Sequence, residues 1–305
     1  MNRRNDEERL TAMDQGFKTI VHDSDVLSWL IRSNVDEFKD RSIEEIKSCL
    51  NIGEDGRTVI GRENEYDSPV NGRIVTDSIF DVKIPGTNDE VSVIVNLEGQ
   101  YYPNPGYPLE KRAEYYMARL VSSQKGVVFS NDDYGRLRKV YSIWIILDPR
   151  SVNRNTVTRY RMEGENVAGN PKRKIPVMET FNIVFINVGR YDSSLPDVSA
   201  FPAALFSKMS VKERQELMSQ KFNISLDDAM NREVDNMASM GEDTYKYGFS
   251  EGVKEGIKNN TIDSIVRLVK KKGMDISEAM SLMEVPEDMA DEIQKEVMER
   301  LDTGL

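Results

Sequence analysis

The stretch "VIVNLEGQ", residues 93–100, decides how the rest of the sequence is interpreted. It is rich in Val, Ile and Leu, as a buried strand is, yet it ends on Glu98 and Gln100. Residues two apart on a strand point to the same face, so both of these side chains leave on the side of Asn96. The stretch is therefore either a solvated strand end or the edge of a functional site.

The residues around this stretch predict an α/β core. A strand is expected over 72–84, a turn at "PGTNDE" (85–90) and a second strand over 91–100, which together make a hairpin. An amphipathic helix is expected over 107–124. Residues 139–148 and 181–188 are apolar throughout, as in strands covered by helices on both faces, and 150–176 is expected to be irregular or a loosely held surface hairpin. This order indicates a mixed β-sheet flanked by helices.

Helices are expected on both sides of this core. Apolar residues at three- and four-residue spacing predict helices within 15–50, with Asp25 and Ser42 as N-caps, and 51–72 is expected to be loop. After residue 205 the chain becomes helical and acidic, and residues 275–301 are expected to form two short helices broken at Pro286. We interpret these as a packing or oligomerisation element, which predicts a domain over 1–205 and a helical tail over 206–305.

The tail also contains a glycine repeat at Gly248, Gly252 and Gly256. Each glycine in a helix costs about 1 kcal/mol relative to alanine. The repeat is therefore either a face that another element approaches closely or a flexible connector.

The composition excludes several classes of protein. The chain has 305 residues, 39% hydrophobic and 30% charged, and no apolar run of about 18 residues that would span a membrane. The charged N-terminal segment is unlike a secretory signal, so a cytoplasmic location is expected. Cys49 is the only cysteine and is expected to be buried. His22 is the only histidine, which excludes sites built from several histidines, and it is expected at the surface between two helices.

Charge is distributed unevenly along the sequence. The net charge is -11, but residues 111–174 contain 14 Lys and Arg against 6 Asp and Glu. Residues 210–305 contain 13 against 21. Because local potential attracts a polyanion, an acidic chain with a basic middle segment is compatible with nucleic-acid binding.

Acidic residues concentrate at the predicted hairpin. Asp77 lies in its first strand, Glu98 ends the second, and Glu65 lies just upstream. Hydrolysis of a phosphodiester needs a divalent cation that lowers the pKa of the attacking water. Mg²⁺ is typically held by one or two carboxylates together with water and substrate phosphate. Two carboxylates on adjacent strands, with Gln100 on the face of the second, meet this need if Asp77 and Glu98 converge.

This arrangement resembles the PD-(D/E)xK nuclease superfamily, in which an Asp, a hairpin turn and an apolar strand ending in Glu-x-Lys form the signature. The run "NEYD…DSIF…PGTNDE…NLEGQYY…YPLEKRAEYYMARLVSSQ…VYSIWI" is similar to the Rpn-like branch, the recombination-promoting nucleases also called PD-(D/E)xK family transposases. In that branch the second motif is commonly Glu-x-Gln. The resemblance covers about residues 15–190 and, more loosely, the glycine repeat of the tail.

The resemblance implies a restriction-endonuclease-like core and a role for each matching residue. Asp77 and Glu98 would be metal ligands, with Gln100 in the position of the usual lysine and Glu65 as a further acid from a preceding helical segment. Asp81 shares the face of Asp77, but the spacing to "PGTNDE" fits Asp77 better. Arg112 and Gln124 would contact water or phosphate from the following helix.

These residues imply an Mg²⁺- or Mn²⁺-dependent DNA endonuclease acting in recombination or mobile-element contexts. DNA would bind along the basic segment, and self-association would use the C-terminal helices. A neutral amide at Gln100 cannot supply the positive charge of lysine, so the alternative is a catalytically silent nuclease-fold module that binds DNA or protein. A third hypothesis is a defence effector whose acidic tail shields its basic face.

Overall fold

A computed structural model describes residues 3–62, 65–66, 74–86, 92–101, 105–170, 172, 175 and 178–302. Within these ranges it leaves out the side chains of 3–10, 65–66, 74–75, 238–257, 287–288 and 302. The chain divides into two compact units, Met1–Gly241 and Glu242–Leu305. None of the helices in the described part of the chain has an apolar stretch that would cross a bilayer.

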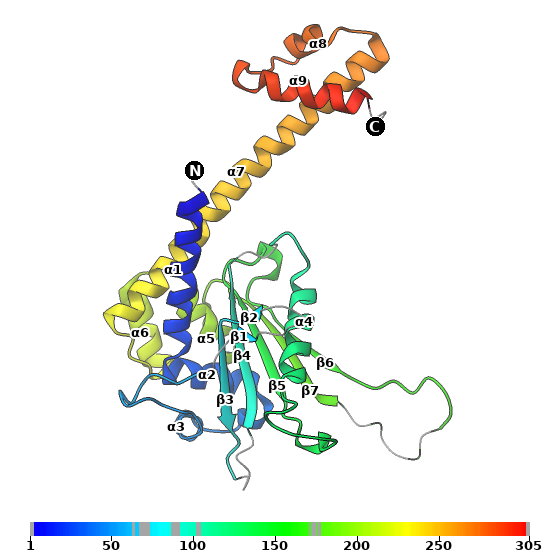
Figure 1. The fold of residues 1–305 in the computed structure, drawn as a ribbon. Helices are drawn as coiled ribbons and strands as arrows, with labels where there is room; N and C mark the ends of the chain where they lie inside the picture. The colour runs from blue at the N-terminus through cyan, green and yellow to red at the C-terminus, as the bar shows by residue number, and fades with distance from the viewer. Residues whose placement is uncertain are drawn as a thin grey trace. The chain divides into compact units, whose positions relative to one another are not determined.

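A five-stranded mixed sheet forms the centre of the first unit (Figure 1). Its order is β3-β4-β5-β7-β6, with β4–β5 and β5–β7 parallel and the two outer pairs antiparallel. The strands are β3 (Ser78–Lys83), β4 (Ser92–Gln100), β5 (Val140–Ile146), β6 (Val157–Met162) and β7 (Met178–Asn187). The prediction of a mixed sheet flanked by helices is confirmed.

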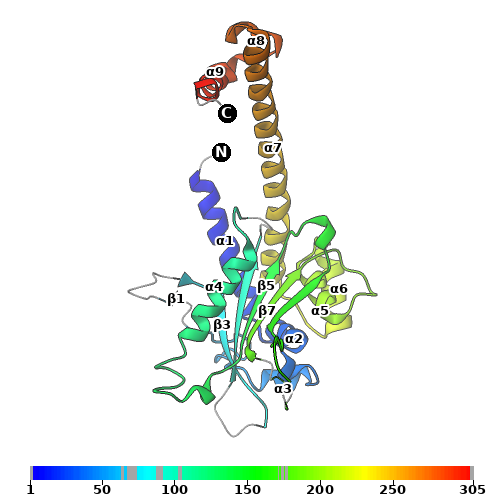
Figure 2. The ribbon, with the colours of Figure 1, turned by 90° about the vertical axis from the view of Figure 1, so that its right-hand side faces the viewer.

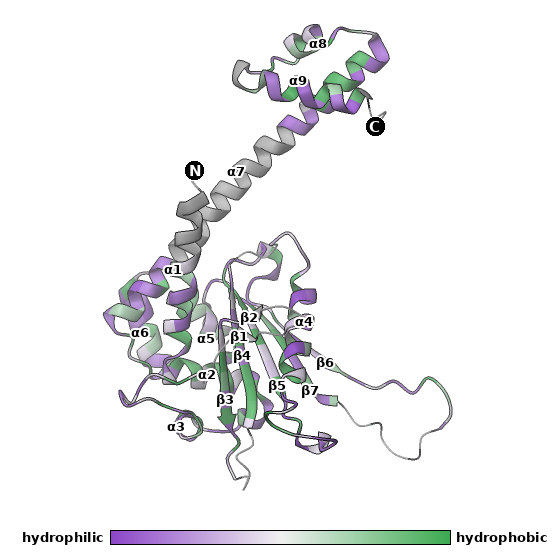
Figure 3. Cartoon of the chain, viewed as in Figure 1, coloured by the Kyte–Doolittle hydropathy of each residue, from purple (hydrophilic) through white to green (hydrophobic). Residues whose placement is uncertain are grey.

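Helices cover both faces of the sheet, which explains why its central strands are apolar throughout. One face packs against α4 (Leu109–Ser122), which connects β4 to β5. The other packs against α1 (Arg3–Val21), α2 (Ser24–Asn34) and α5 (Asp197–Phe206). The two views in Figures 1 and 2 show α4 and α1 on opposite sides of the strands. Figure 3 shows apolar residues concentrated in β3, β4 and β5.

The expected first strand is interrupted. The described residues of this stretch, 74–84, form β2 (Ile74–Val75) and, after a break, β3, while β2 pairs with β1 (Glu65–Tyr66) in a separate two-stranded sheet. Asp77 therefore lies just before β3 rather than within a strand. The segment 150–176, expected to be irregular or a loose hairpin, contributes β6, which pairs antiparallel with β7.

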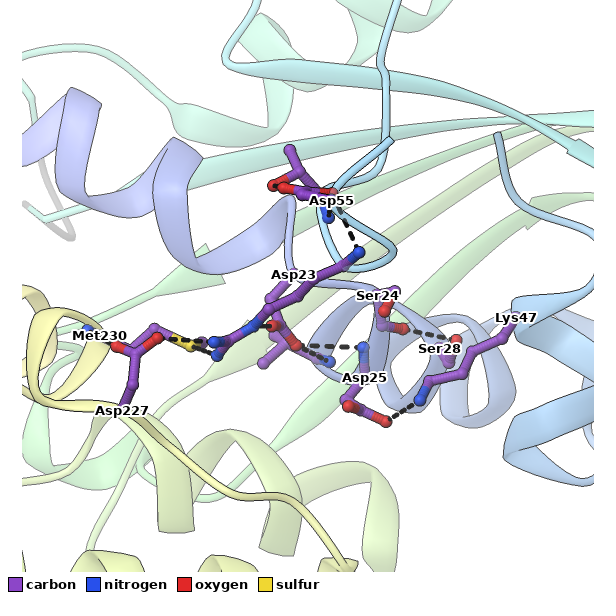
Figure 4. A network of polar contacts seen from close by, with 11 residues as sticks. Asp23, Ser24, Asp25, Ser28, Lys47, Asp55, Asp227 and Met230 are labelled. Atoms are coloured by element: carbon purple, nitrogen blue, oxygen red, sulfur yellow. Dashed lines mark hydrogen bonds and ion pairs between the residues drawn. The ribbon is translucent and has the colours of Figure 1, made fainter. Parts of the chain in front are cut away.

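The helix termini near the N-terminus follow local capping rules. Ser42 caps α3 (Ile43–Lys47) with a capping box that includes Glu45, as expected. The predicted cap Asp25 is wrong: the cap is Asp23, two residues earlier, and it accepts hydrogen bonds from the N–H groups of Asp25 and Val26. The other oxygen of Asp23 pairs with Arg57, which also binds Asp227 near the start of α7 (Asp228–Lys272) (Figure 4).

The first unit extends beyond the expected boundary at residue 205. After α5, the helix α6 (Val211–Phe222) and the first part of α7 bury Met218, Phe222 and Val234 in the same core as the sheet. A truncation designed to test whether the acidic tail shields the basic face should therefore remove only residues after Gly241.

The second unit contains the end of α7, α8 (Ile276–Leu282) and α9 (Glu287–Asp302), with a core of its own. The break between α8 and α9 falls at Pro286, as predicted. The glycine repeat lies within the continuous backbone of α7; its side-chain surroundings are outside the described residues.

His22 is half-buried rather than at the surface as expected. Its Nδ1 lies 2.8 Å from the carbonyl oxygen of Val59 and its Nε2 3.0 Å from the hydroxyl of Ser78. Because a carbonyl only accepts, Nδ1 carries the proton and neutral Nε2 accepts from Ser78. Burial lowers the pKa of His22. The ring thus links the start of the domain to β3 as a neutral group.

We expect the His22→Gln variant to lose about 1–2 kcal/mol of unfolding free energy near neutral pH, because two hydrogen bonds are weakened. A lowered folded-state pKa means that the unfolded chain binds the proton more readily. The stability that neutral His22 contributes is therefore present above the ordinary histidine pKa and falls as pH decreases towards the lowered value.

Urea denaturation of both proteins between about pH 7.5 and pH 5.5 tests this expectation. The gap between wild type and His22→Gln should narrow as pH falls. A gap that stays constant or widens would contradict it.

Candidate active site

The candidate site lies where β4 ends beside the start of β3. Ser78 pairs with Leu97 in the antiparallel register, which brings the preceding Asp77 next to Glu98. The N–H of Gly99 donates to Oδ2 of Asp77 at 2.7 Å, and the backbone of Asp77 hydrogen-bonds to the carboxylate of Glu98. Each carboxylate is thus held by the backbone of the other segment.

Both carboxylates resist ionisation. Glu98 is only 2% exposed, and burial, together with the charge of Asp77, raises its pKa well above the ordinary value. Burial and the charge of Asp14 raise the pKa of Asp77 to about 6. Two neighbouring buried carboxylates repel each other when both are charged. A bound cation would remove this penalty.

Asn96 fixes one oxygen of Glu98 from within the same strand. Its Nδ2 donates to Oε1 of Glu98 at 3.2 Å and to the hydroxyl of Ser142 at 3.1 Å. The indole of Trp144 donates to that same hydroxyl at 2.9 Å. Asn96 and Glu98 therefore share a face, as the two-residue period predicts, and a buried polar chain sets the orientation of Glu98.

Arg112 of α4, which the resemblance assigns to contact with water or phosphate, lies beside Glu98 and Gln100. Its guanidinium is 3.9 Å from Oε2 of Glu98 and 3.5 Å from Oε1 of Gln100. It also lies over the rings of Tyr116 and Trp144, at 4.9 and 5.4 Å from their centroids. Gln100 is 8% exposed, so the amide in the position of the usual lysine is buried next to this cation.

The helix α1 adds two charged residues that the sequence did not reveal. The ring of Phe17 lies against Gly99, where a Cβ would come within 2.7 Å of it. The carbonyl of Met13 accepts a hydrogen bond from Tyr101 at 3.3 Å. These contacts hold α1 over the end of β4, and the charges of Asp14 and Lys18 both act on Asp77. Their four-residue spacing, which places them on one helix face, was the available signal.

Other predicted site residues lie elsewhere. Asp81 pairs with Arg62 and Arg138, opposite Ile94 and away from Glu98. The structure therefore favours Asp77 over Asp81 as the partner of Glu98.

Gln124 is not brought to the site. Its amide donates to the carbonyl of Arg138 and accepts from the N–H of the same residue, at the end of α4 away from Arg112. Glu65 lies in β1, opposite Val75, rather than in a helical segment, and its side chain is outside the described residues.

The donor set suits a cation held by few protein ligands. Among the described side chains, no group of three or more His, Cys, Asp or Glu is arranged to hold a metal ion. Mg²⁺ commonly takes only one or two carboxylates from the protein and keeps water and phosphate as its other ligands. Burial raises the pKa values of both Asp77 and Glu98. A cation bound between them would lower these pKa values, because it stabilises the charged form of each carboxylate. The pair therefore fits a divalent cation.

The basic segment 111–174 is less positive in the structure than in the sequence. Several of its cations pair with acids from outside the segment: Arg112 with Glu98, Arg138 with Asp81, Lys139 with Glu37 and Glu179, and Arg159 and Arg161 with Asp36. The excess of positive charge available to a polyanion is correspondingly smaller.

Comparison of the chain with models of protein families, with curated proteins and with solved structures gives no match. Membership of the PD-(D/E)xK superfamily therefore stays a proposal.

We expect the Asp77→Asn variant to be more stable than wild type in EDTA near pH 7.5, by about 1–2 kcal/mol, because it removes a buried charge of raised pKa. Replacing a charged active-site residue with a neutral one often stabilises the folded protein while it reduces activity. Thermal unfolding measures the difference.

The matched control is Asp81→Asn, four residues along the same segment. This change leaves Arg62 and Arg138 without their carboxylate, so it should lower the melting temperature. A lower melting temperature for Asp77→Asn as well would show that the charge of Asp77 does not destabilise the folded protein.

Proposed function

We propose that the chain is a Mg²⁺- or Mn²⁺-dependent DNA endonuclease with a restriction-endonuclease-like core, of the Rpn-like PD-(D/E)xK type. The observation that carries the proposal is the convergence of Asp77 and Glu98, two carboxylates of raised pKa held by reciprocal backbone hydrogen bonds. Perturbed carboxylates that cluster with cations are typical of catalytic sites.

The fold is consistent with this proposal. The superfamily signature has an acid before a hairpin and a second acid at the end of the next strand; Asp77 directly precedes β3, and Glu98 lies near the end of β4. Gln100 follows two residues later and reaches the same side, next to Arg112. The parallel crossover through α4 brings Arg112 back over the end of β4.

Each residue has a defined task in phosphodiester hydrolysis. A divalent ion bound by the carboxylates would lower the pKa of water and stabilise charge on the phosphate. Asp77 and Glu98 provide its protein ligands, and Asn96 keeps Glu98 oriented. Gln100 can accept or donate a hydrogen bond to the attacking water.

Positive charge comes from outside the motif. Lysine in the motif would stabilise developing negative charge, which the neutral Gln100 cannot do. Arg112 on α4 and Lys18 on α1 bring cations to the two sides of the carboxylate pair. Substrate phosphate would meet positive charge from these helices rather than from β4.

One observation favours the alternative of a catalytically silent binding module. Arg112 lies close to both Glu98 and Gln100, and its charge partly compensates the acid that should bind the metal. If Arg112 stays beside Glu98 when DNA binds, its charge would compete with a metal ion for that carboxylate.

A nicking assay on supercoiled plasmid separates the two functions. Wild type should nick the plasmid in Mg²⁺ and not in EDTA, and Glu98→Ala and Asp77→Ala should reduce the rate at least about a hundredfold, because the metal ligands are lost. Asp81→Ala, which removes a carboxylate outside the site, is the control and should retain most activity.

If wild type binds DNA but does not nick it, the nuclease proposal is wrong and the binding module is supported. If Glu98→Ala nicks the plasmid as fast as wild type does, the candidate site is not the site of cleavage.

A further inference from the structure

Three half-exposed tyrosines lie on and beside α4, and each lies next to a cation. They are Tyr107, Tyr115 and Tyr134, with 45%, 48% and 57% of the side chain exposed, and we call them the tyrosine row. Burial does not account for these rings, because the core under α4 is made by other residues, among them Ala113, Met117 and Leu120.

The row begins at the carboxylates. The hydroxyl of Tyr107 accepts a hydrogen bond from Arg112 at 3.2 Å. The same guanidinium lies 3.9 Å from Glu98. Only one side chain therefore separates the first exposed ring of the row from the acid at the centre of the site.

The row continues along the helix. Tyr115 lies beside Tyr116, with ring centroids 6.5 Å apart, and Arg112 stacks over Tyr116. Arg119 donates to the hydroxyl of Tyr115 at 3.1 Å, and its guanidinium lies 5.9 Å from that ring. Because residues three and four apart share a side of a helix, these groups form a strip that starts at Arg112.

The third exposed ring, Tyr134, lies beyond the C-terminus of α4 in the sequence. Lys125 lies 6.0 Å from the ring of Tyr134, which packs against Phe129 at 5.4 Å. Each exposed ring is thus held by a neighbour and leaves surface open to solvent. Each of the three exposed rings has a cation beside it.

The charge of this strip is modest. Glu110 and Glu114 lie on the same helix, and Lys111 pairs with Glu114. A surface that binds the phosphate backbone of duplex DNA depends on dense positive charge, and aromatic rings add little to such contacts. Rings interleaved with a few cations are instead the arrangement that binds unpaired bases by stacking and their phosphates by charge.

We propose that the tyrosine row binds single-stranded DNA and delivers it to the carboxylates, with bases stacked on Tyr107 and Tyr115 and phosphates near Arg112, Arg119 and Lys125. The substrate of the proposed nuclease is then a single strand or an unpaired segment, and this inference rests on the proposed function. Bases of an intact duplex stack on one another and cannot use these rings.

Fluorescence anisotropy in EDTA tests binding without cleavage. The probes are a labelled oligothymidylate of about 20 nucleotides and a duplex of equal length. Tyr115→Ala and Tyr107→Ala should each weaken oligothymidylate binding about five- to hundredfold, and Tyr115→Phe, which keeps the ring, should weaken it less than about threefold. Duplex binding should change less than about twofold in all variants.

The matched control is Tyr160→Ala. Tyr160 has the same 48% exposure as Tyr115 but lies on β6, three strands from β4. It should bind oligothymidylate like wild type. Circular-dichroism melting of every variant shows that the fold is retained.

Oligothymidylate binding that is unaffected by either alanine variant would overturn the inference, as would equal losses for single strand and duplex. The nicking assay reports on the proposed function separately. Metal-dependent cleavage together with binding that does not depend on the tyrosines would support the nuclease proposal and contradict the stacking surface. Tyrosine-dependent binding without cleavage would support the stacking surface and contradict the nuclease proposal.

Discussion

The structure around the candidate site depends on holding two carboxylates together in a buried place. Asp77 and Glu98 are kept next to each other by hydrogen bonds that cross between β3 and β4. Burial raises both pKa values, helped by the charge of Asp14 at Asp77 and by the charge of Asp77 at Glu98, so the fold holds an unfavourable electrostatic interaction that a cation would relieve. The register of the antiparallel pair sets their proximity, and one residue of slippage would separate them.

Much of the sheet was predictable because burial on two faces leaves a strong pattern in the sequence. The apolar strands near 140–146 and 178–187, and the amphipathic helix α4, were expected within a few residues of their observed limits. The common face of Asn96, Glu98 and Gln100 followed from the period of a strand alone. The site was predictable to the extent that it lies in one hairpin and the helix after it.

The remaining parts depend on contacts between residues distant in sequence. Asp14 and Lys18 reach Asp77 only because α1 packs on the end of β4, which no local pattern specifies. The cap at Asp23 prevailed over Asp25 because Arg57, a distant residue, pairs with its second oxygen. In the same way, the count of cations in 111–174 overlooked partners such as Asp36, and so overstated the charge of the surface.

Gly99, between Glu98 and Gln100, has a consequence for how the candidate site is assembled. A side chain there would collide with Phe17, so the first helix lies directly on the backbone of the site. The acids and cations therefore come together only once segments about 80 residues apart have met, and closing a loop of that length costs conformational entropy. A partly folded chain that already has the correct hairpin would still lack Asp14 and Lys18. The candidate site is therefore complete only when α1 has packed against the sheet.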